Sequence, residues 1–598
     1  MKIPLSRIIS LNRRYFLGIN FGHNSSVAIV GEDYEVKGHF DIDRLTKISG
    51  DHGVDVATTE MLLNGWGINW RNIRAIGVNH VWHPSDPIYQ LANRPLLPKN
   101  FSVAQPSTEL INQLNSVGYA KINKPLWSKN IPVFRAGHHA AHATSAGWTS
   151  PYQCCLTLVL DGMGDGINYS VFDTSSRKIR LLEASNRIPN YAHLWEVMSR
   201  IIFQQDRRDA PIGLDIYYPS KGPGKLMALA GLTHPTIEMV KQIKALARDP
   251  LLYSTRLDEV VELQRIIDSY LGVTLRLDQN GQNWEKLAPL AAALQAATNE
   301  DLTLVFKRIR DTFKVRNLCL AGGLALNCVA TSAAARATGL SRVYVPSFSN
   351  DSGIAVGAAY LALHATHEGA GRRKLLARNR RVSQSKFSPY LGPKSTPLAA
   401  DVSEFCAKQT GLKLSVLDND EVAADTVANL ILAGEIVAIY RGRAESGPRA
   451  LCQRSFLGNV FQEDLCNKMN ALKRRESFRP VAPVIRIDDA QLIFEELLLD
   501  SPYMTQAQFI KQEFRQVLSG CTHIDGSARP QLVREHEVFL WRLLSTVKAA
   551  RGWGVVGNTS LNIKGPIIER WKEVISIVHK SQLVKFSLID NMLISRNN

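Results

Sequence analysis

The chain has 598 residues, of which 45% are apolar and 21% charged, and its formal net charge is +17. This length exceeds what one hydrophobic core holds, so about two to four domains are expected. No run approaches the roughly 20 apolar residues of a membrane span.

The 8 cysteines include no Cys-x-x-Cys pair, which excludes zinc-ribbon and thioredoxin chemistry. Several lie in apolar runs, as reduced cysteines of a cytoplasmic protein do. Residues 1–14 are basic and lack the apolar run and cleavage site of a secretory signal.

A strand, a polar or acidic Gly turn and a second strand occur twice in the N-terminal half. Residues 14–22 predict a strand that ends in a Gly turn, and residues 27–30 predict a second strand after the polar stretch 23–26. The pattern returns over residues 156–172, with Asp161 at the start of the turn. The repeat predicts two duplicated halves that face one cleft, with turn glycines that offer N–H groups to phosphate.

An alanine-rich stretch between these repeats contains three histidines and favours a helix. His138 and His142 are four residues apart and lie on one face, whereas His139 points away from them. Two imidazoles on one face bind a divalent metal such as iron, zinc or manganese when carboxylates complete the site. Asp161 and Asp351 follow strand-like runs, and open α/β sheets place ligands at such strand ends. The spacing alone also fits two structural histidines.

A mainly helical region is expected from Ala192 to Phe313. It contains Gly222-Pro223-Gly224-Lys225, which fits either a phosphate contact or a plain loop. The strand that follows ends at Gly322 and Gly323, before a helix that starts near Asn327, and this geometry presents backbone amides to an anion. No Gly-Lys-Ser/Thr follows, so this is not a Walker loop.

The composition shifts to Arg, Lys, Ser, Gly and Pro near residues 369–397, which indicates a domain boundary. We expect a first domain over residues 1–370, a linker over 371–400 and a second domain over 401–598. The basic clusters in the linker are typical of a solvated segment. A predicted helix that ends at Ala433, followed by a buried strand that ends at Tyr440, opens the second domain.

Cations are dense beyond that strand and alternate with Gly and Pro rather than with helical spacing. Arginine binds phosphate and carboxylate through paired N–H groups, so the pattern indicates a polyphosphate pocket; a salt-bridged surface is the alternative. Small amide and hydroxyl side chains near the last strand complete this pocket. The residues of the predicted pocket are Arg443, Arg449, Lys473, Arg475, Arg479, Arg529, Asn558 and Ser560.

Several motifs, in this order along the chain, together resemble the O-carbamoyltransferases of the nodulation-factor and antibiotic-tailoring type. The resemblance covers the chain from Gly18 to about Ile594. It implies an α/β fold with an N-terminal actin–hexokinase-like duplicated domain, similar to the threonylcarbamoyl-transferring protein, and a C-terminal YrdC-like α/β domain. The motifs are HHAAHATSA, LVLDGMGDG, LAGGLALNC, SNDSGIAVGAA, GRAESGPRALCQRS, RESFRPVAP and GNTSLNIKG.

The resemblance also implies a reaction scheme. The C-terminal domain takes carbamoyl phosphate and ATP, with Mg²⁺, to carbamoyl adenylate, and the N-terminal domain transfers the carbamoyl group to a hydroxyl of a small natural-product or sugar acceptor. The cations of the predicted pocket match the family's carbamoyl phosphate and ATP site. The remaining implied roles are a metal site, most simply Fe²⁺ with Mn²⁺ or Zn²⁺ as alternatives, on His138, His142, Asp161 and Asp351; catalytic positions at His23 and Asp161; and nucleotide contacts at Lys47, Gly322, Gly323 and Asn327.

The sequence departs from the family pattern at a few positions. Asn24 stands where the family usually has Asp, and an amide cannot act as a base. Residues 41–47 read Asp-Ile-Asp-Arg-Leu-Thr-Lys where the family usually has Glu-Glu-Arg-x-Thr-Arg, and Ser446 stands where a bulky apolar residue is common. All four predicted metal ligands are present, so we interpret these differences as changes in acceptor binding or as minor adjustments of the site.

Other interpretations stay open at this point. A threonylcarbamoyl-type tRNA-modifying enzyme would require threonine and tRNA, and a non-catalytic ATP-binding module would bind nucleotide without turnover and nucleic acid in a salt-dependent way. A hydrogenase-maturation carbamoyltransferase has zinc-finger Cys pairs and the reverse domain order. We expect a small hydroxylated acceptor rather than nucleic acid or a membrane as partner, and a monomer or homodimer. Acceptor specificity is expected in the helical region and near Trp82 and His83, where the sequence gives no code.

Overall fold

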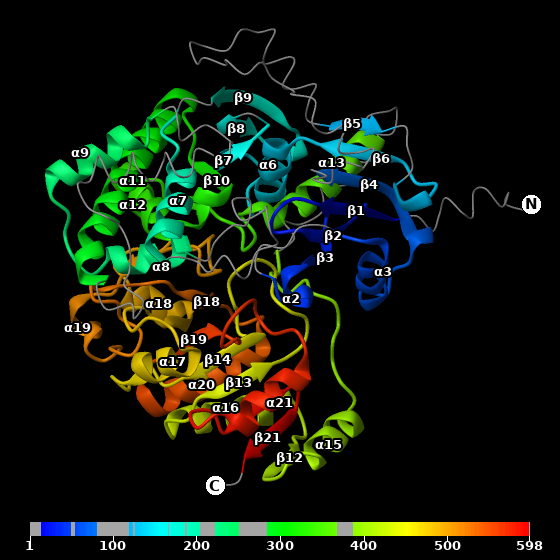
Figure 1. Ribbon diagram of the computed structural model, residues 1–598, viewed down its shortest axis with the longest axis vertical. Helices are drawn as coiled ribbons and strands as arrows, with labels where there is room; N and C mark the ends of the chain where they lie inside the picture. Colours follow the sequence, from blue (N-terminus) through cyan, green and yellow to red (C-terminus); the bar gives the residue numbers. More distant parts are fainter. Residues whose placement is uncertain are drawn as a thin grey trace, which may run out of the picture.

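The computed structural model describes residues 14–48, 54–79, 119–122, 126–165, 167–185, 188–203, 222–249, 284–367 and 387–596. Figure 1 shows two groups of layers, an N-terminal part up to residue 367 and a C-terminal part from residue 387. The predictions that concern Trp82, His83 and the basic linker clusters lie outside the described residues.

The N-terminal part contains two sheets with the same topology. In each sheet, three consecutive strands form an antiparallel meander, and two later strands add in parallel on the other side of the first strand. The strand orders are β3-β2-β1-β4-β6-β5 and β11-β10-β7-β8-β9. This repetition confirms the predicted actin–hexokinase-like duplication. The strands are β1 (Tyr15–Asn20), β2 (Ser26–Gly31), β3 (Val36–Asp41), β4 (Ile73–Asn79), β5 (Tyr119–Ile122), β6 (Val133–Ala136), β7 (Leu156–Gly164), β8 (Ile167–Asp173), β9 (Arg180–Ser185), β10 (Asn317–Ala321) and β11 (Arg342–Tyr344).

Two small-residue helices lie between these sheets (Figure 1). Helix α6 (His138–Thr149) packs on β7 and β10, and α13 (Ile354–His367) packs on β1 and β4. The helices touch each other where a Cβ on Gly357 would lie 1.9 Å from the carbonyl oxygen of Ala141. Glycine is therefore required at this crossing, and the close approach fixes α6 relative to both sheets.

The remaining helices of the N-terminal part cover the outer faces of the sheets. The second sheet buries its outer face against the region predicted to be mainly helical, as far as that region is described. These helices are α2 (Asp43–Thr46), α3 (Val56–Gly65), α7 (Tyr191–Phe203), α8 (Gly222–Ala230), α9 (Ile237–Leu246), α11 (Trp284–Phe313) and α12 (Cys328–Thr338).

The C-terminal part is built on one mixed sheet of eight strands, in the order β12-β21-β20-β13-β14-β19-β15-β18. Helices cover both faces, so that each face has its own apolar core. The strands are β12 (Leu412–Val416), β13 (Val437–Tyr440), β14 (Arg454–Gly458), β15 (Ala482–Arg486), β18 (Gln531–Val533), β19 (Val555–Ser560), β20 (Phe586–Ile589) and β21 (Met592–Arg596). The helices are α15 (Ala399–Ala407), α16 (Asp420–Leu432), α17 (Leu465–Lys473), α18 (Ile487–Ile493), α19 (Gln512–Arg515), α20 (Val538–Arg551) and α21 (Trp571–Lys580).

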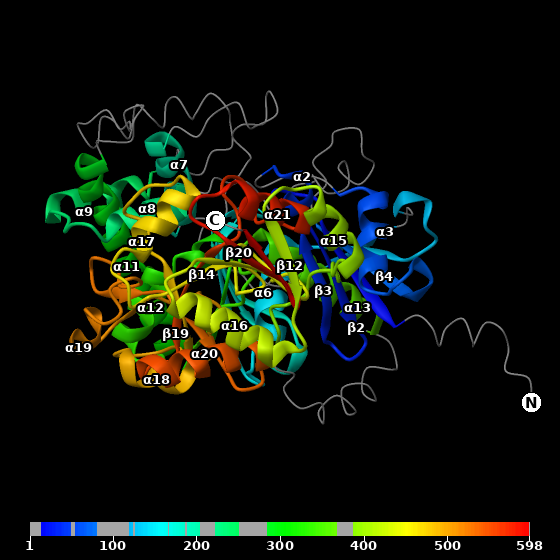
Figure 2. The same ribbon diagram turned by 90° about the horizontal axis from the view of Figure 1, so that it is seen from below.

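Figure 2 shows the two parts of the molecule from below. Buried hydrogen bonds tie these parts together. The Ser501 hydroxyl donates to the carbonyl of Val343 and accepts from the amide of Val345, so the C-terminal part continues the edge of β11. Arg336 of α12 donates to the side chain of Gln508 over 2.8 Å. The active-site elements of the two parts are therefore held in a defined relation.

Candidate active site

The four predicted metal ligands converge between α6 and the ends of two strands. His138 and His142 lie in the first turns of α6, Asp161 lies in β7, and Asp351 opens the short turn that leads into α13. The Nε2 of His138 is 3.1 Å from Oδ2 of Asp161, and the Nε2 of His142 is 3.3 Å from Oδ1 of Asp351. One ligand atom from each of the four side chains lies within 4.8 Å of all the others. Residues more than two hundred positions apart thus share one small volume.

Burial and mutual charge set the protonation of this cluster. Burial lowers the pKa of His138, but the charge of Asp351 and the hydrogen bond and charge of Asp161 outweigh it and raise this pKa to about 9. Burial likewise raises the pKa of Asp161, yet the hydrogen bond and charge of His138 hold it well below its usual range. The two carboxylates thus favour positive charge at this spot, whether a proton or a metal cation supplies it.

The donor set fits a divalent transition metal. The side chain of His142 is fully buried; its Nδ1 has no hydrogen-bond partner among the described residues, and its Nε2 faces Oδ1 of Asp351 at 3.3 Å. A cation bound between Nε2 and the carboxylates would offset the cost of burying these polar and charged groups. Two imidazoles and two carboxylates suit Fe²⁺, Mn²⁺ or Zn²⁺.

His23 approaches the same carboxylate from the solvent side. Its Nε2 lies 3.1 Å from Oδ2 of Asp351, and its side chain is 35% exposed, whereas the side chain of Asp351 is 7% exposed. The amide of Asn20 fixes the neighbouring backbone by donating to the carbonyl of Asp351 over 3.0 Å. His23 is therefore the member of the group that an incoming molecule reaches first.

The Gly pair after β10 supports the cluster from the other side. The amide of Gly323 donates to Oδ1 of Asp161 over 2.8 Å, which orients the other oxygen toward His138. Gly322 has φ of +91°, and a Cβ there would lie 2.2 Å from the carbonyl oxygen of Leu160, so this position requires glycine. The Asn327 side chain accepts from the amide of Ala330 and so caps α12. Of the predicted nucleotide contacts, Lys47 lies apart and pairs with Glu573 of α21 over 3.2 Å.

Four of the predicted cations form a second cluster, here called the arginine cluster: Arg449, Arg475, Arg479 and Arg529. Burial, together with the charges of Arg529 and Arg479, lowers the pKa of Arg449 to about 9. Burial acts in the same way on Arg475, with the charges of Arg479 and Arg529 adding to it. The Nε atoms of Arg449 and Arg529 have no hydrogen-bond partner within the described part of the chain. Cations crowded in this way favour an anion.

A carboxylate beside the arginine cluster is engaged elsewhere. Glu476 pairs with Lys225 of α8 over 2.9 Å, while its other oxygen is 3.8 Å from the guanidinium of Arg479, beyond hydrogen-bond range. Lys225 comes from the Gly-Pro-Gly-Lys stretch, and its ammonium is committed to this pair. The arginine cluster thus lies where α8 of the N-terminal part meets the C-terminal part.

The other predicted pocket residues hold the framework. The Lys473 ammonium donates to Ser560 and Asn562 at the end of β19, and the Asn558 amide donates to the carbonyl of Ala450 over 2.8 Å. Arg443 lies away from the arginine cluster and donates to the carbonyls of Lys37, Leu391 and Gly392. Arg443 therefore joins the two parts of the molecule.

Two buried groups near these sites have no signal in the local sequence. His139 lies beside β8, where its ring contacts the Ser170 hydroxyl and the Ile167 carbonyl at 2.7 and 3.1 Å. Burial and the charge of His138 lower its pKa to about 4. His39 of β3 contacts residues from both parts of the molecule. Only the three-dimensional contacts show what these two residues do, because His39 is a single histidine in an apolar strand and His139 points away from the predicted ligand face of its helix.

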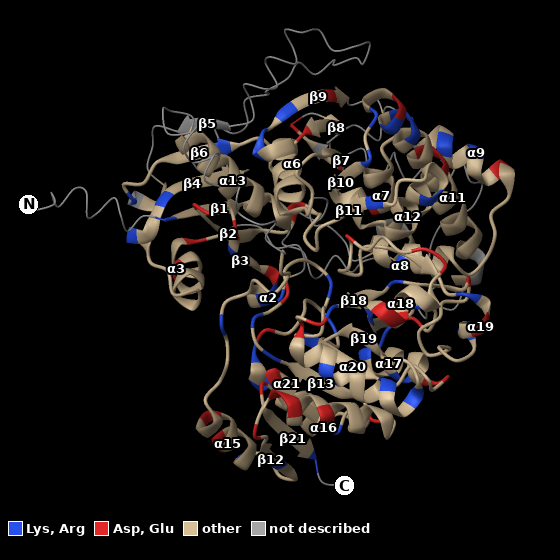
Figure 3. Ribbon diagram, turned by 180° about the vertical axis from the view of Figure 1, so that it is seen from behind, with Lys and Arg blue, Asp and Glu red and all other residues tan. Residues whose placement is uncertain are grey.

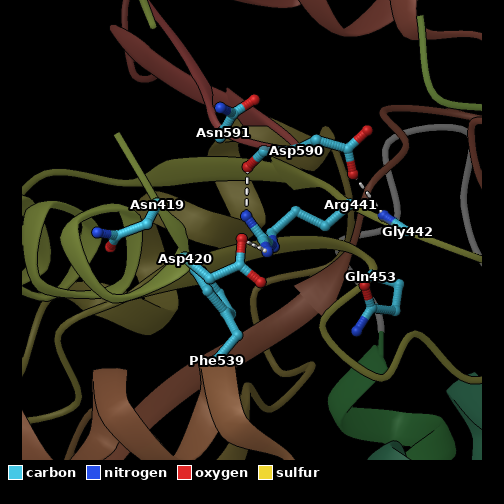
Figure 4. Close-up of a pocket in the computed structure, with 8 residues that line it drawn as sticks. All are labelled: Asn419, Asp420, Arg441, Gly442, Gln453, Phe539, Asp590 and Asn591. Carbon is cyan, nitrogen blue, oxygen red and sulfur yellow. Dashed lines mark hydrogen bonds and ion pairs between the residues drawn. The ribbon is translucent and has the colours of Figure 1, made fainter. Parts of the chain in front are cut away.

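A shallow pocket in the C-terminal part is separate from both clusters (Figure 4). The guanidinium of Arg441 lies 3.9 Å over the ring of Phe539 and pairs with Asp420 over 2.9 Å. No predicted site residue lines this pocket, whose lining is Asn419, Asp420, Arg441, Gly442, Gln453, Phe539, Asp590 and Asn591.

Charge and hydropathy add two general facts. Figure 3 shows Lys and Arg on elements of both parts, interspersed with Asp and Glu. Among the described residues, none of the helices combines the length and the apolar character needed to cross a bilayer.

Comparison with known proteins agrees with this geometry. A family model for the carbamoyltransferase N-terminus matches residues 15–360, and one for the carbamoyltransferase C-terminus matches residues 428–596. Both clusters fall inside these matches. The chain belongs to the carbamoyltransferase family, and it is an enzyme that transfers a carbamoyl group.

Relatives place the chain more narrowly. Nodulation protein U of Rhizobium tropici is 35% identical over 471 residues, 76% of this chain and 74% of that protein. The 3'-hydroxymethylcephem-O-carbamoyltransferase of Amycolatopsis lactamdurans is 36% identical over 249 residues, 42% of this chain and 43% of that protein. Among solved structures, the activator of 2-hydroxyisocaproyl-CoA dehydratase from Clostridium difficile has a TM-score of 0.32 at 13% identity, over 60% of this chain and 97% of that one. Within the family, the chain belongs with the O-carbamoyltransferases.

Proposed function

We propose that this enzyme is an ATP-dependent O-carbamoyltransferase that forms carbamoyl adenylate at the arginine cluster and transfers its carbamoyl group to a hydroxyl at the metal-ligand cluster. The observation that carries the proposal is the pair of sites: one partly buried cluster of cations and one buried cluster of two imidazoles and two carboxylates. A YrdC-like C-terminal domain that begins near residue 401, as expected from the sequence, is part of this proposal.

The first half-reaction takes place at the arginine cluster. Carbamoyl phosphate and water give carbamate and phosphate; a carbamate oxygen then attacks the α-phosphorus of ATP, and pyrophosphate leaves. Guanidinium groups stabilise the charge that spreads over the phosphoryl oxygens, as in other phosphoryl transfers. Arg449, Arg475, Arg479 and Arg529 take this role, because burial leaves them poorly compensated until an anion arrives.

The second half-reaction takes place at the metal-ligand cluster. The acceptor oxygen attacks the carbamoyl carbon, and AMP leaves. His23 accepts the hydroxyl proton, because it is the exposed member of the group and an imidazole has an unperturbed pKa near 6.5. His138, His142, Asp161 and Asp351 would hold a divalent cation, which when bound would supply positive charge for the carbonyl oxygen as that oxygen gains charge.

The acceptor is a hydroxylated small molecule. The relatives are named for a cephem carbamoylation and for nodulation, and both names support a natural-product or sugar hydroxyl. We place the reaction in the cytoplasm, where ATP and carbamoyl phosphate are made.

The test is release of pyrophosphate by the full-length protein with ATP, carbamoyl phosphate, Mg²⁺ and Mn²⁺. The proposal predicts release that needs carbamoyl phosphate but neither threonine nor tRNA, and a mass gain equal to one carbamoyl group in a hydroxylated acceptor screen. Folded protein that releases no pyrophosphate contradicts adenylate formation, and release that requires threonine and tRNA favours the RNA-modifying alternative.

A further inference from the structure

His39 joins the metal-ligand cluster to the loop that carries Arg449. It lies in β3 of the N-terminal part and is fully buried. Its Nε2 is 2.8 Å from the carbonyl oxygen of Ser352, the residue after Asp351, and its Nδ1 is within hydrogen-bond distance of the Ser446 hydroxyl. A single imidazole thus contacts the loops of both sites.

The partners of His39 fix its tautomer. A carbonyl oxygen can only accept, so Nε2 carries the hydrogen that goes to Ser352. Nδ1 is then an acceptor, and the Ser446 hydroxyl must donate to it. Ser446 is 1% exposed and Ser352 is 2% exposed, so water does not replace either bond. His39 therefore donates to Ser352 through Nε2 and accepts from Ser446 through Nδ1, so both of its ring nitrogens have a partner.

The residues around the hydrogen bonds of His39 pack tightly. Gly447, with φ of +90°, lies against the loop before Asp351, and a Cβ there would be 2.1 Å from the carbonyl oxygen of Ser347. The His39 ring lies 5.3 Å from the ring of Phe348 in the same loop. A shift of residues 445–449 therefore displaces the backbone that carries Asp351.

Ser446 is also a departure from the family pattern, where a bulky apolar residue is common. The imidazole of His39 occupies the space beside Ser446, and the small hydroxyl lets the ring approach within hydrogen-bond distance. This polar contact links the two parts of the molecule.

We propose that His39 is a positioning residue: through Ser352 it holds Asp351 in place for the metal, and through Ser446 it ties that position to the loop of the arginine cluster. Partners of metal ligands of this kind change metal affinity by about 10- to 100-fold when they are removed. The inference rests on the proposed function, because it presumes a metal on the four ligands and an anion on the arginines.

The test is Mn²⁺ affinity, measured by the electron paramagnetic resonance signal of free Mn²⁺, for four full-length proteins. His39→Gln keeps an amide near the Nε2 position and so keeps the Ser352 contact, whereas His39→Asn keeps the Ser446 contact and loses Ser352. The paired variant His39→Ala with Ser446→Leu restores an apolar contact without any hydrogen bond. We expect wild-type affinity in His39→Gln and a loss of about tenfold or more in the other two variants.

A second titration repeats the measurement with saturating phosphate and ATP. We expect these anions to tighten Mn²⁺ binding to the wild type by about fivefold, a typical coupling between sites, and to have no such effect on His39→Gln or Ser446→Ala. Wild-type affinity in the paired variant, with its thermal midpoint unchanged, overturns the positioning role. An unchanged anion effect in Ser446→Ala overturns the tie to the arginine loop.

Failure of this inference and failure of the proposed function give different results. Pyrophosphate release by the wild type tests the function alone, whereas the Mn²⁺ affinities need no carbamoyl phosphate. Wild-type protein that binds no Mn²⁺ overturns the positioning role of His39 whatever the pyrophosphate result.

Discussion

At the scale of single residues, the metal-ligand cluster depends on side chains that burial has separated from water. The side chain of His142 is fully buried, and its Nε2 lies 3.3 Å from Asp351. The Gly323 amide turns Asp161 toward His138. Hydrogen bonds and ion pairs thus fix how these groups are oriented, and fixed polar groups of this kind stabilise charge in a transition state.

Replacing His142 should separate the two half-reactions. His142→Ala removes one of the four ligands, so we expect Mn²⁺ affinity to fall by at least about 100-fold and carbamoyl transfer to be lost. Pyrophosphate release should stay near the wild-type rate, because the arginine cluster is untouched. Calorimetry and a pyrophosphate assay check this, with exposed His234→Ala as the control. Equal loss of both activities in His142→Ala would refute the assignment to two sites.

His39 should make stability depend on pH. Burial lowers its pKa, so the folded chain keeps it neutral below pH 6.5 while the unfolded chain takes up a proton. The unfolded state therefore binds more protons, and stability falls as the pH falls, by at most about 1.4 kcal/mol per pH unit.

We expect the thermal midpoint of the wild type to fall relative to that of His39→Gln between pH 7 and pH 5.5. Calorimetric scans at matched ionic strength measure the difference. Parallel midpoints over this range would mean that His39 is already charged in the fold.

The sequence predicted which side chains of the metal-ligand cluster lie together, because their positions follow local patterns. The four-residue spacing of His138 and His142 and the strand-end positions of Asp161 and Asp351 placed these side chains together in advance, and the structure brings them within 4.8 Å. Their role as metal ligands stays a prediction. The contacts of His39 and the framework role of Arg443 were not predictable, since both depend on where two distant parts of the chain meet.

At the scale of secondary-structure elements, α6 carries two of the ligands, and its position is set by backbone contact with α13. A Cβ on Gly357 would lie 1.9 Å from the Ala141 carbonyl oxygen. A Cβ on Gly18 of β1 would likewise lie 1.8 Å from the carbonyl oxygen of Ala355 in α13. Small residues here are therefore a requirement of the site as well as of the fold.

Gly357→Ala should disturb the site from a distance. The added methyl group forces α6 away from α13, which we expect to cost about 1–3 kcal/mol or more and to weaken Mn²⁺ binding. The matched control is Gly224→Ala in α8, where a Cβ meets nothing within 4 Å and the change should be neutral or stabilising by about 0.5–1 kcal/mol. Denaturation midpoints and Mn²⁺ titration measure both variants. Wild-type stability in Gly357→Ala would show that the helices part without cost.

The positions of strands along the sequence were more predictable than the order of the strands within a sheet. The strand and turn pattern predicted β1, β2, β7, β8 and β10 near their observed bounds, because alternation and Gly turns are local signals. The order of the eight-stranded sheet depends on pairings between distant segments. No local pattern specifies those pairings.

At the scale of the whole molecule, the arginine cluster lies where the two parts meet. Lys225 of α8 pairs with one oxygen of Glu476 over 2.9 Å, and the other oxygen lies 3.8 Å from the guanidinium of Arg479, in a longer ion pair. Figure 3 shows Lys and Arg interspersed with Asp and Glu on the described elements of both parts. Charge alone therefore says less about the ligand than the local crowding of four guanidinium groups does.

Two arginines should respond in opposite ways to removal of their charge. Arg529→Met relieves repulsion within the cluster, so the ligand-free protein should be as stable as the wild type or more so, and the rise of the thermal midpoint with carbamoyl phosphate should disappear. Arg443→Met removes a donor from three partly buried carbonyls and should cost about 1–3 kcal/mol while keeping that rise.

Thermal shift assays with and without carbamoyl phosphate make this comparison. The matched pair removes one positive charge in each case, so a general charge effect cancels. A ligand-dependent rise that survives in Arg529→Met and vanishes in Arg443→Met would reverse the assignment of the anion site.

The most direct test of the account is an anomalous difference map of crystals grown with Mn²⁺. The account predicts one strong peak within bonding distance of His138, His142, Asp161 and Asp351 and its loss in His142→Ala crystals. A wild-type map with no peak among these four side chains would contradict it.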